Sequence, residues 1–454
     1  MDLRQALAAL VGDRHVLSDP ERKAPYERDY TGRYGGAARV VVRPADTAEV
    51  AGVMAVCAEH RAAVVPQGGN TGLVGAGVPR DGEIVLTLER LTELGEVDSA
   101  VGQVTVGAGA TLAALQAAAH GAGQDAALDF AARDSCTVGG VVACDAGGAR
   151  ALRHGTARAH VAGLEAVLAD GSIVSRLTGL VKDNAGYDLP ALMIGSEGTL
   201  GIITRVRWKL APLLGSRVAA LVALESASQA AELLASLRAH APSLESCDFF
   251  LDDGLQLVLE HQRRASPLRT RAPFYVLAEC AARSDPTDEL AQALAQAGID
   301  DALLADDGTG RERLCALREG HTDAINAAGV PHKLDVGIPL DQLDRFLGQV
   351  PEAVSSAGGE RAILFGHLGD GNVHVNVLGA AADDARVDDA VLELTLRCGG
   401  TISAEHGVGV AKAAWLERAR GAEQVAAMRS IKRALDPDNL LNPGAVLSSL
   451  AARR

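Results

Sequence analysis

The dipeptide Asp370-Gly371 is the feature that most constrains the fold, because it separates two apolar-rich runs and strongly predicts a tight β-hairpin turn. A two-residue turn at this position places His367 directly opposite His374, and residues that lie opposite each other share one face of a sheet. Asn376 is two residues beyond His374, so it points to the same face. The sequence therefore predicts one hairpin that presents two imidazoles and an amide on a small patch.

A carboxylate and a third imidazole follow in the pair Glu405-His406, beside two glycines that let backbone approach closely. Two His and one Glu are a ligand set typical of an open, catalytic divalent-metal site. A single His in a strand is usually structural, but a pair brought together by one turn favours a site. The same set suits a zinc hydrolase or a non-catalytic metal-binding protein, so other parts of the chain must decide between these functions.

Composition places the chain among soluble globular proteins with more than one domain. Its 454 residues suggest two or three domains, with 48% hydrophobic and 22% charged residues. A net charge of −15 and only 3% aromatic residues argue against a nucleic-acid partner. Small anionic substrates stay possible, because a site can be locally positive within an acidic protein.

The cysteines and the apolar runs predict a cytoplasmic location. The seven cysteines are odd in number, and none of them has C-x-x-C spacing, which favours structural thiols in a reducing compartment. Residues 1–10 carry charges where a secretory signal would be apolar, so we expect no signal peptide. No run reaches about 18 apolar residues, and we expect no transmembrane segment.

The N-terminal part predicts a strand, helix, strand unit that ends in a glycine-rich loop. Residues 39–42 and 63–66 read as strands, and Asp46 or Thr47 can cap the helix between them. The loop that follows, residues 67–77, contains five glycines. Such a loop can turn backbone N–H groups inward around an anion, which predicts a phosphate or diphosphate site.

Two common nucleotide motifs are absent from this region. No G-x-x-x-x-G-K-[ST] sequence occurs, which excludes a P-loop. The glycines Gly107 and Gly109 follow a strand, but Leu112 stands where a dinucleotide fingerprint has its third glycine. A nicotinamide Rossmann site is therefore disfavoured.

Two more clusters of small residues follow, at residues 133–148 and 182–204. A hairpin around Asp170-Gly171 separates them. Because each cluster lies beside regular structure, the three together predict one long ligand held by close backbone contacts.

The pattern of predicted secondary structure changes near residue 213, where strands begin to alternate with amphipathic helices. Short connections predict an antiparallel sheet with helices on one face. A predicted helix over 311–326 places Arg318 and Thr322 on one face, and strand alternation places Lys333 beside Asp335. The Asn-Pro-Gly turn of residues 442–444 suggests that the tail docks on another element.

Five motifs occur in a recognisable order: GGNTGL at 68–73, GSEGTLG at 195–201, GHLGDGNVH at 366–374, AEHGVG at 404–409 and NPG at 442–444. Together they resemble the FAD-linked oxidoreductases of the vanillyl-alcohol oxidase and p-cresol methylhydroxylase type. Within this family they are most similar to the branch of D-2-hydroxyglutarate and D-lactate dehydrogenases.

The resemblance implies an α+β fold. Residues 1–213 would form a two-subdomain FAD-binding domain of the p-cresol methylhydroxylase type. Residues 214–400 would form a substrate or cap domain with an antiparallel sheet covered by helices. Residues 401–454 would return to the flavin domain.

The resemblance also implies residue roles. His367, His374 and Glu405 would bind a divalent metal, with zinc the expected ion, and His406 would be the general base. Substrate carboxylates would contact Arg318, Thr322, Lys333 and Asn376. FAD would bind without a covalent link, because Asn70 stands in the first glycine loop with no His nearby. The residues expected to contact FAD are Pro66, Gly68, Gly69, Asn70, Thr71, Gly72, Leu73, Ser135, Thr137, Gly139, Gly140, Glu197, Gly201, Ile202 and Asn442.

The implied reaction is oxidation of a D-2-hydroxy acid to the 2-oxo acid, with metal-assisted proton abstraction and hydride transfer to flavin N5. Two basic side chains near the site, Arg318 and Lys333, favour a dicarboxylate substrate, hence D-2-hydroxyglutarate over D-lactate or glycolate. A quinone, an electron-transferring flavoprotein or a cytochrome would accept the electrons. A zinc hydrolase or a metal-binding protein would instead contain no flavin.

Overall fold

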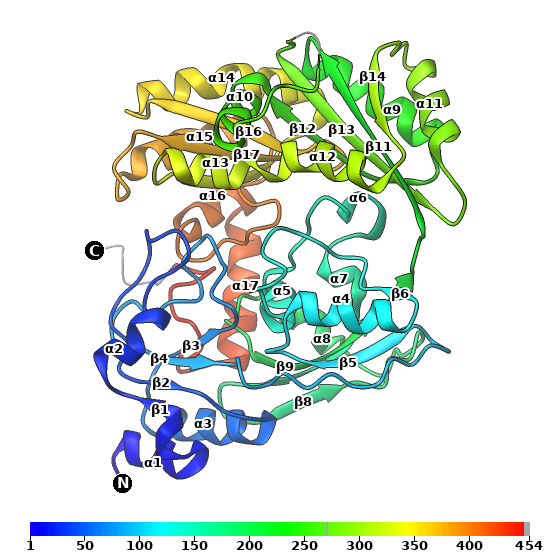
Figure 1. Cartoon of the computed structure of the whole chain (residues 1–454). Coiled ribbons are helices and arrows are strands. Elements are labelled where there is room, and N and C mark those ends of the chain that lie inside the picture. The colour runs from blue at the N-terminus through cyan, green and yellow to red at the C-terminus, as the bar shows by residue number, and fades with distance from the viewer. Residues whose placement is uncertain (269–270, 449–454) are drawn as a thin grey trace. The chain divides into compact units, whose positions relative to one another are not determined.

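The computed structural model describes residues 1–268 and 271–448 (Figure 1). The chain forms two compact units, each described here by itself. The first unit comprises Met1–Gly147, Thr156–Leu213 and His406–Arg454, and the second comprises Gly148–Gly155 and Leu214–Glu405. Among the described residues, no helix is both long and apolar enough to cross a membrane.

One sheet of the first unit contains the predicted strand, helix, strand unit. Its strand order is β1-β2-β4-β3, and β2, β4 and β3 run parallel. The connecting helix α3 (Thr47–Glu59) begins where the side chain of Asp46 accepts a hydrogen bond from the N–H of Glu49. These elements confirm the prediction for residues 39–66. The strands are β1 (Val16–Leu17), β2 (Val41–Val42), β3 (Val64–Gln67) and β4 (Ile84–Thr87).

A second sheet of this unit is antiparallel, in the order β5-β9-β7-β8. The predicted hairpin at Asp170-Gly171 joins β7 to β8, and Gly171 has a φ of 85°. Apolar side chains of both sheets and of the helices around them form one core. The strands are β5 (Gln103–Gly107), β7 (Val161–Val167), β8 (Ile173–Arg176) and β9 (Ile202–Lys209), with β6 (Gln124–Asp125) and β10 (Ala211–Pro212) paired separately.

Short helices complete the first unit. They are α1 (Leu3–Val11), α2 (Pro20–Lys23), α4 (Leu112–Gly121), α5 (Val138–Cys144), α7 (Ala157–His160), α8 (Leu189–Met193), α16 (Leu416–Arg420) and α17 (Ala422–Leu435), with 3-10 turns at Asp13–His15, Ala24–Tyr26 and Ala413–Trp415.

The C-terminal tail docks on the first unit, as its Asn-Pro-Gly turn suggested. The N–H of Asn442 donates to the carbonyl of Val64 in β3 at 2.8 Å. Lys432 in α17 is buried and donates to the carbonyls of Thr199 and Leu441 at 2.8 and 2.7 Å. These bonds tie the tail to the third cluster of small residues.

The second unit is built on a seven-stranded sheet in the order β14-β11-β13-β12-β16-β17-β15. Every neighbouring pair is antiparallel, as predicted. The strands are β11 (Ser216–Leu224), β12 (Leu244–Leu251), β13 (Phe274–Ala282), β14 (Ala302–Ala305), β15 (His332–Gly337), β16 (Arg361–His367) and β17 (Asn372–Leu378).

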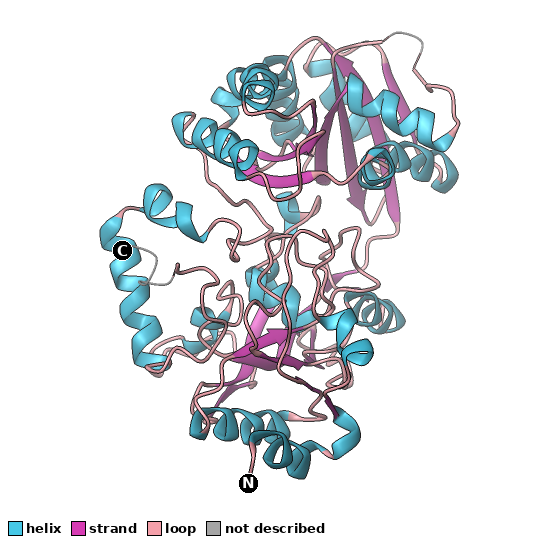
Figure 2. Cartoon of the chain, turned by 90° about the vertical axis from the view of Figure 1, so that its left-hand side faces the viewer, coloured by secondary structure: helices cyan, strands magenta, loops and turns pink. Residues whose placement is uncertain are grey.

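Helices cover both faces of this sheet, not one face as the sequence suggested (Figure 2). Apolar residues of α10, α12 and α13 pack on the face that carries Phe250, Tyr275 and Phe365. The opposite face is covered by α9, α11, α14 and α15. The helices are α9 (Ala227–His240), α10 (Asp252–Gln262), α11 (Thr287–Gln296), α12 (Gly308–Glu319), α13 (His321–Ala328), α14 (Leu343–Ser356) and α15 (Ala385–Arg397), with α6 (Ala151–His154) and a 3-10 turn at Leu340–Gln342.

The single helix predicted over 311–326 is two helices, α12 and α13, which meet at Gly320. A Cβ atom at Gly320 would lie 2.4 Å from the Gln262 side chain and 2.9 Å from the carbonyl of Ala316. The junction therefore requires a glycine, because it packs directly against the end of α10.

Candidate active site

The loop between β16 and β17 spans residues 368–371, so the predicted two-residue turn is wrong. His367 pairs with Asn372, and the residue opposite His374 is Phe365. Because the register differs from the predicted one by two residues, and side chains alternate with a period of two, His367 and His374 still share one face.

The geometry of the loop explains this difference. A type I′ turn needs positive φ at both central residues, but Gly371 alone of the Asp370-Gly371 pair has it, with φ 75°. Oδ1 of Asp370 instead accepts a hydrogen bond from the N–H of Asn372 at 3.1 Å. Such a bond from an Asp side chain to the backbone two residues on stabilises a wider loop.

The two imidazoles of the hairpin and Glu405 come together, as predicted. The ring centroids of His367 and His374 are 5.3 Å apart, and the rings meet edge to face. Nε2 of His367 lies 3.7 Å from Oε1 of Glu405, and Nε2 of His374 lies 3.6 Å from the same oxygen. Three groups that can bind a cation thus converge on one point in the second unit.

Asp335 adds a carboxylate that sequence reasoning did not assign to the site. Ligand atoms of Asp335, His374, Glu405 and His406 all lie within 4.8 Å of one another, and His406 is placed there by its peptide bond to Glu405. Oδ2 of Asp335 accepts hydrogen bonds from the N–H groups of Ala404 and Glu405 at 3.0 and 2.9 Å. Imidazole nitrogens with carboxylate oxygens suit zinc, manganese or iron, so these residues fit a divalent metal.

A second unassigned carboxylate, Asp248 of β12, lies beside the same hairpin. Its Oδ1 is 2.7 Å from Nδ1 of His367. Burial lowers the pKa of His367, but the carboxylates of Asp248 and Glu405 outweigh burial and raise that pKa to about 10. The site is therefore electrostatically suited to a cation.

Arg318 extends this face of the sheet from α12. Its Nε lies 3.0 Å from Oδ2 of Asp248, and its guanidinium carbon is 4.5 Å from the centroid of the Phe365 ring. Within the described residues, its terminal nitrogens donate no hydrogen bond. They are thus available for a carboxylate, although Asp248 already balances part of the charge.

Lys333 and Asn376 lie opposite each other on β15 and β17, on the face that carries His374. Burial lowers the pKa of Lys333 to about 8, against the attraction of Asp323. Among the described residues no carboxylate pairs with this ammonium within 4.0 Å. Thr322, the second residue of α13, is partly exposed, and no described residue forms a hydrogen bond with its side chain.

The first glycine loop offers donors for an anion. Across the described chain, the backbone N–H groups of residues 68–77 donate no hydrogen bond to a protein acceptor. Asn70 adopts a φ of 53°, and its side chain donates to the carbonyl of Arg28 at 2.8 Å, which holds the loop open. Consecutive free N–H groups form the kind of concave donor array that binds phosphate. These residues fit the diphosphate of a dinucleotide such as FAD.

The clusters predicted to contact one ligand lie side by side in the first unit. A Cβ atom at Gly68 would lie 2.3 Å from the Thr137 hydroxyl, and one at Gly69 would lie 1.8 Å from the Ser135 carbonyl. These two glycines are therefore required by packing between loops. A Cβ at Gly198 would lie 2.9 Å from Pro66, so the third cluster packs against β3, the strand that leads into the first glycine loop.

Most N–H groups of the second cluster bind protein acceptors. Gly139 donates to the carbonyl of Ala108, and Gly140 donates to the hydroxyl of Thr137. Gly201 packs against Met193 and lies beside Ile202, the first residue of β9. The second cluster therefore offers fewer free donors than residues 68–77.

Glu197 and Asn442 connect the C-terminal segment to the third cluster. The buried carboxylate of Glu197 accepts hydrogen bonds from the N–H groups of Val408 and Gly409 at 2.7 and 2.8 Å. The amide of Asn442 donates to the carbonyls of Glu197 and Ala76 at 2.8 and 3.0 Å. The Glu197 side chain thus serves the protein's own packing, beside the residue that follows His406.

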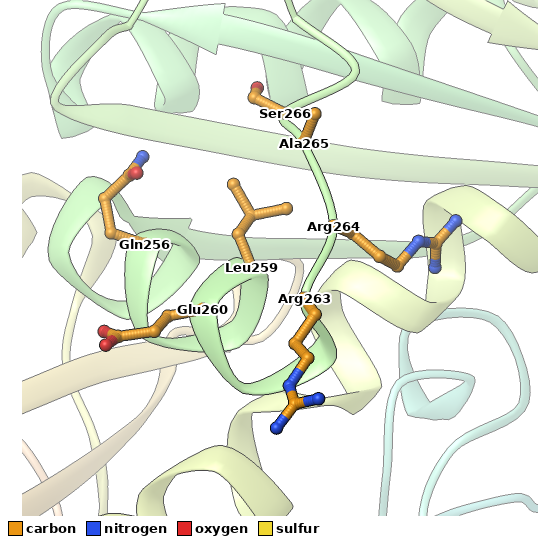
Figure 3. Close-up of a pocket in the computed structure, with 7 residues that line it drawn as sticks. All are labelled: Gln256, Leu259, Glu260, Arg263, Arg264, Ala265 and Ser266. Carbon is orange, nitrogen blue, oxygen red and sulfur yellow. The ribbon is translucent and has the colours of Figure 1, made fainter.

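A pocket elsewhere in the second unit holds none of the predicted site residues. It lies along α10 and the segment after it (Figure 3), and its lining is Gln256, Leu259, Glu260, Arg263, Arg264, Ala265 and Ser266. Its lining includes the charged side chains of Glu260, Arg263 and Arg264 but none of the four residues of the candidate metal group.

Asp248 and Asp335 were missed because they reach the site from strands far apart in sequence. A usable signal existed for Asp335, since strand alternation from Lys333 places its side chain on the same face. For Asp248 no local signal exists, because it depends on β12 pairing with β16 across more than a hundred residues.

Family comparisons agree with this geometry. Residues 38–176 match an FAD binding domain, and residues 214–446 match the C-terminal domain of FAD linked oxidases. A D-2-hydroxyglutarate dehydrogenase of Xanthomonas citri pv. viticola is 37% identical over 98% of this chain and 96% of that protein. The mitochondrial D-2-hydroxyglutarate dehydrogenase of Bos taurus is 36% identical over 98% of this chain and 83% of its own length.

Solved structures confirm the predicted fold. p-Cresol methylhydroxylase with substrate bound superposes with a TM-score of 0.79 at 16% identity, over 98% of this chain and 96% of that one. A 4-ethylphenol oxidase from Gulosibacter chungangensis gives a TM-score of 0.78 at 19% identity, over 98% and 96%. The family models and the relatives support a flavin enzyme and lend no support to a zinc hydrolase. The chain belongs to the FAD-linked oxidases, and it is an oxidoreductase with a p-cresol methylhydroxylase-like fold.

Proposed function

We propose that this protein is an FAD-dependent dehydrogenase that oxidises D-2-hydroxyglutarate to the 2-oxo acid, with a divalent metal at the substrate site. Zinc is the metal we propose. The relatives named D-2-hydroxyglutarate dehydrogenase, which align over 98% of this chain, support the substrate class.

The observation that carries the proposal is that one face of the sheet in the second unit holds both possible metal ligands and basic side chains. Nε2 of His367 and Nε2 of His374 lie there 3.7 and 3.6 Å from Oε1 of Glu405, and His374 and Glu405 also belong to the group of possible metal ligands with Asp335 and His406. Lys333 lies on the same face with no partner carboxylate among the described residues, and Arg318 borders it. A cation site beside two basic side chains suits a substrate with a hydroxyl and two carboxylates.

Each residue then has a defined task. We assign proton abstraction from the substrate hydroxyl to His406, because an imidazole nitrogen can accept a proton as a general base and His406 lies beside Glu405, His374 and Asp335. Arg318 and Lys333 hold the carboxylates, with Arg318 the better planar clamp. Asn376 and Thr322 supply further polar contacts. When bound, the metal supplies a Lewis acid for the hydroxyl, and FAD supplies the acceptor for the hydride.

We propose that residues 1–213 with 401–454 hold FAD non-covalently and that residues 214–400 hold the substrate. The free N–H groups of residues 68–77 support a diphosphate site there. Backbone at Pro66, Leu73, Gly201 and Ile202 lies in or beside the same group of loops. No His stands in the 67–77 loop, which supports a dissociable cofactor.

A specific observation favours a second candidate, D-lactate or glycolate. Asp248 already lies 3.0 Å from Arg318, which leaves Lys333 as the cation without a carboxylate partner in the described chain. One free cation is sufficient for a monocarboxylate. We rank the dicarboxylate first, because the terminal nitrogens of Arg318 stay available.

We also propose a cytoplasmic location and a protein or quinone electron acceptor. All seven cysteines are free thiols, which supports a reducing compartment. The acceptor classes are a quinone, an electron-transferring flavoprotein or a cytochrome.

Two measurements test the proposal: an absorption spectrum for bound flavin and a dye-reduction assay for hydroxy-acid oxidation. Purified protein should be yellow and should release FAD on acid precipitation. It should reduce an artificial dye with D-2-hydroxyglutarate. A colourless protein that binds added zinc but turns over no hydroxy acid would overturn the proposal.

A further inference from the structure

We propose that Asp248 is a positioning residue that couples the metal side of the site to the substrate-carboxylate side. This inference rests on the proposed function. Its two carboxylate oxygens serve two different groups: Oδ1 lies 2.7 Å from Nδ1 of His367, and Oδ2 lies 3.0 Å from Nε of Arg318. We assign Asp248 no direct contact with metal or substrate; it acts through the side chains of His367 and Arg318.

The first contact orients a metal-ligand imidazole. Asp248 and His367 lie directly opposite each other on β12 and β16, so the contact is set by strand pairing. A carboxylate at Nδ1 keeps the N–H on that nitrogen, which leaves Nε2 as the lone-pair atom. Nε2 is the nitrogen that faces Glu405, at 3.7 Å. Asp248 therefore selects the ring orientation and tautomer that a metal requires.

The second contact holds the substrate clamp. Arg318 is placed between Asp248 on its Nε side and the face of the Phe365 ring, 4.5 Å from the guanidinium carbon. Because Asp248 holds Nε of Arg318 from one side, the terminal nitrogens of Arg318 point in one direction. The Arg318 side chain therefore loses less conformational entropy when a substrate carboxylate binds.

The burial of Asp248 supports a role of this kind. It is 5% exposed, and a buried carboxylate is costly unless its partners compensate it. The buried carboxylate of Asp248 is thus stabilised only while His367 and Arg318 both stay in place.

A matched control exists on the same face of the sheet. Glu279 on β13 pairs with Arg311 of α12 at 3.2 Å, as Asp248 pairs with Arg318 one strand away. Both pairs join a strand carboxylate to an Arg of the same helix. Among the described residues, Glu279 forms no ion pair or hydrogen bond with a His of the hairpin, so Glu279→Gln removes a strand-to-helix ion pair without touching the site.

The test measures zinc and a dicarboxylate separately on flavin-loaded protein. Zinc affinity is measured by competition with a chromophoric chelator on metal-stripped protein. Glutarate, a dicarboxylate that lacks the hydroxyl and cannot be oxidised, is titrated by calorimetry into zinc-loaded protein. Flavin content and Tm report folding for every variant.

Asp248→Ala should weaken zinc binding about 10- to 100-fold, the usual effect of removing such a partner. It should also weaken glutarate binding about 10-fold, because Arg318 loses the carboxylate, 3.0 Å from its Nε, that holds the guanidinium in one position before glutarate binds. Asp248→Asn, which keeps the shape, should separate the two effects. Its amide oxygen can still accept from His367, but its NH₂ opposes Arg318, so zinc stays within about threefold while glutarate weakens.

Glu279→Gln should change neither affinity. Unchanged zinc and glutarate binding in a folded Asp248→Ala, or unchanged glutarate binding in Asp248→Asn, would overturn the inference alone. Wild-type protein that bound neither zinc nor glutarate would overturn the proposed function and this inference with it.

Discussion

The backbone N–H of Gly148 donates a 2.6 Å hydrogen bond to Oε2 of Glu405, although 257 residues separate the two in sequence. The other oxygen, Oε1, faces the histidines of the hairpin at 3.6 and 3.7 Å. One oxygen is therefore held by the protein, and the other is directed towards the position proposed for a cation.

The first prediction concerns this carboxylate. Glu405→Gln should weaken zinc binding by more than about 100-fold, because loss of a ligand exceeds the effect of losing an outer partner. Chelation should abolish wild-type activity, and added zinc or manganese should restore it. Chelator competition measures the affinity, with Glu260→Gln, a change at an exposed carboxylate of α10, as control. Activity that is indifferent to chelators would remove the metal from the mechanism.

The second prediction concerns the proposed base. His406→Ala should reduce kcat by about two to four orders of magnitude, the usual contribution of a general base, while FAD content stays unchanged. The exposed residue His240, at the end of α9, provides the control variant His240→Ala. Steady-state assays at several pH values measure kcat. A fully active His406→Ala enzyme would show that another group takes the proton.

The third prediction uses the titration of Lys333. Its pKa is about 8, so the ammonium is charged below that pH and neutral above it. We expect KM for D-2-hydroxyglutarate to rise several-fold as pH increases from about 7 to about 9.5, with a smaller rise for D-lactate. Lys333→Arg, which stays charged, should flatten the profile. Identical profiles for wild type and Lys333→Arg would contradict the assignment of this Lys to a carboxylate.

The fourth prediction concerns stability of the second unit. Burial alone raises the pKa of Glu245, but hydrogen bonding to His154 and the charges of Arg150 and Arg217 lower it to about 2 from an ordinary 4.5. A lowered carboxyl pKa stabilises the folded state above about pH 4.5, and this contribution is lost as pH falls towards 2. This difference in the pKa of Glu245 corresponds to about 3 kcal/mol in the free energy of unfolding.

Glu245→Gln should therefore lower Tm at neutral pH, and its difference from wild type should shrink below about pH 4.5. Circular dichroism melts at pH 7 and pH 3.5 measure this, with Glu260→Gln again as the control. A Tm difference that is the same at both pH values would show that the ionised carboxylate contributes no stability.

Particular residues explain what the sequence could and could not predict. The shared face of His367 and His374 was predictable even though the turn was wrong, because a register change of two residues preserves the face. The break at Gly320 was not predictable from local pattern, since it depends on packing against Gln262 of α10. Asp248 enters the site only through the pairing of β12 with β16, a long-range choice that no local signal encodes.

The loop at residues 68–77 shows the opposite case. Its glycines and Asn70 mark it locally as a place for free N–H groups, and the folded loop keeps those groups without protein acceptors among the described residues. For Gly68 and Gly69 the glycine pattern has a different cause, because close contacts with Thr137 and Ser135 leave no room for a side chain. A glycine motif alone does not separate ligand contact from loop packing.

The most direct test of the account is the ratio of kcat/KM for D-2-hydroxyglutarate to that for D-lactate, measured with a dye acceptor on zinc-loaded protein, with the L-enantiomers alongside. The account predicts a yellow enzyme that prefers the D-dicarboxylate by about 10-fold or more, because two cations contribute instead of one. Equal values for the two D-acids, or turnover of the L-enantiomers alone, would contradict it.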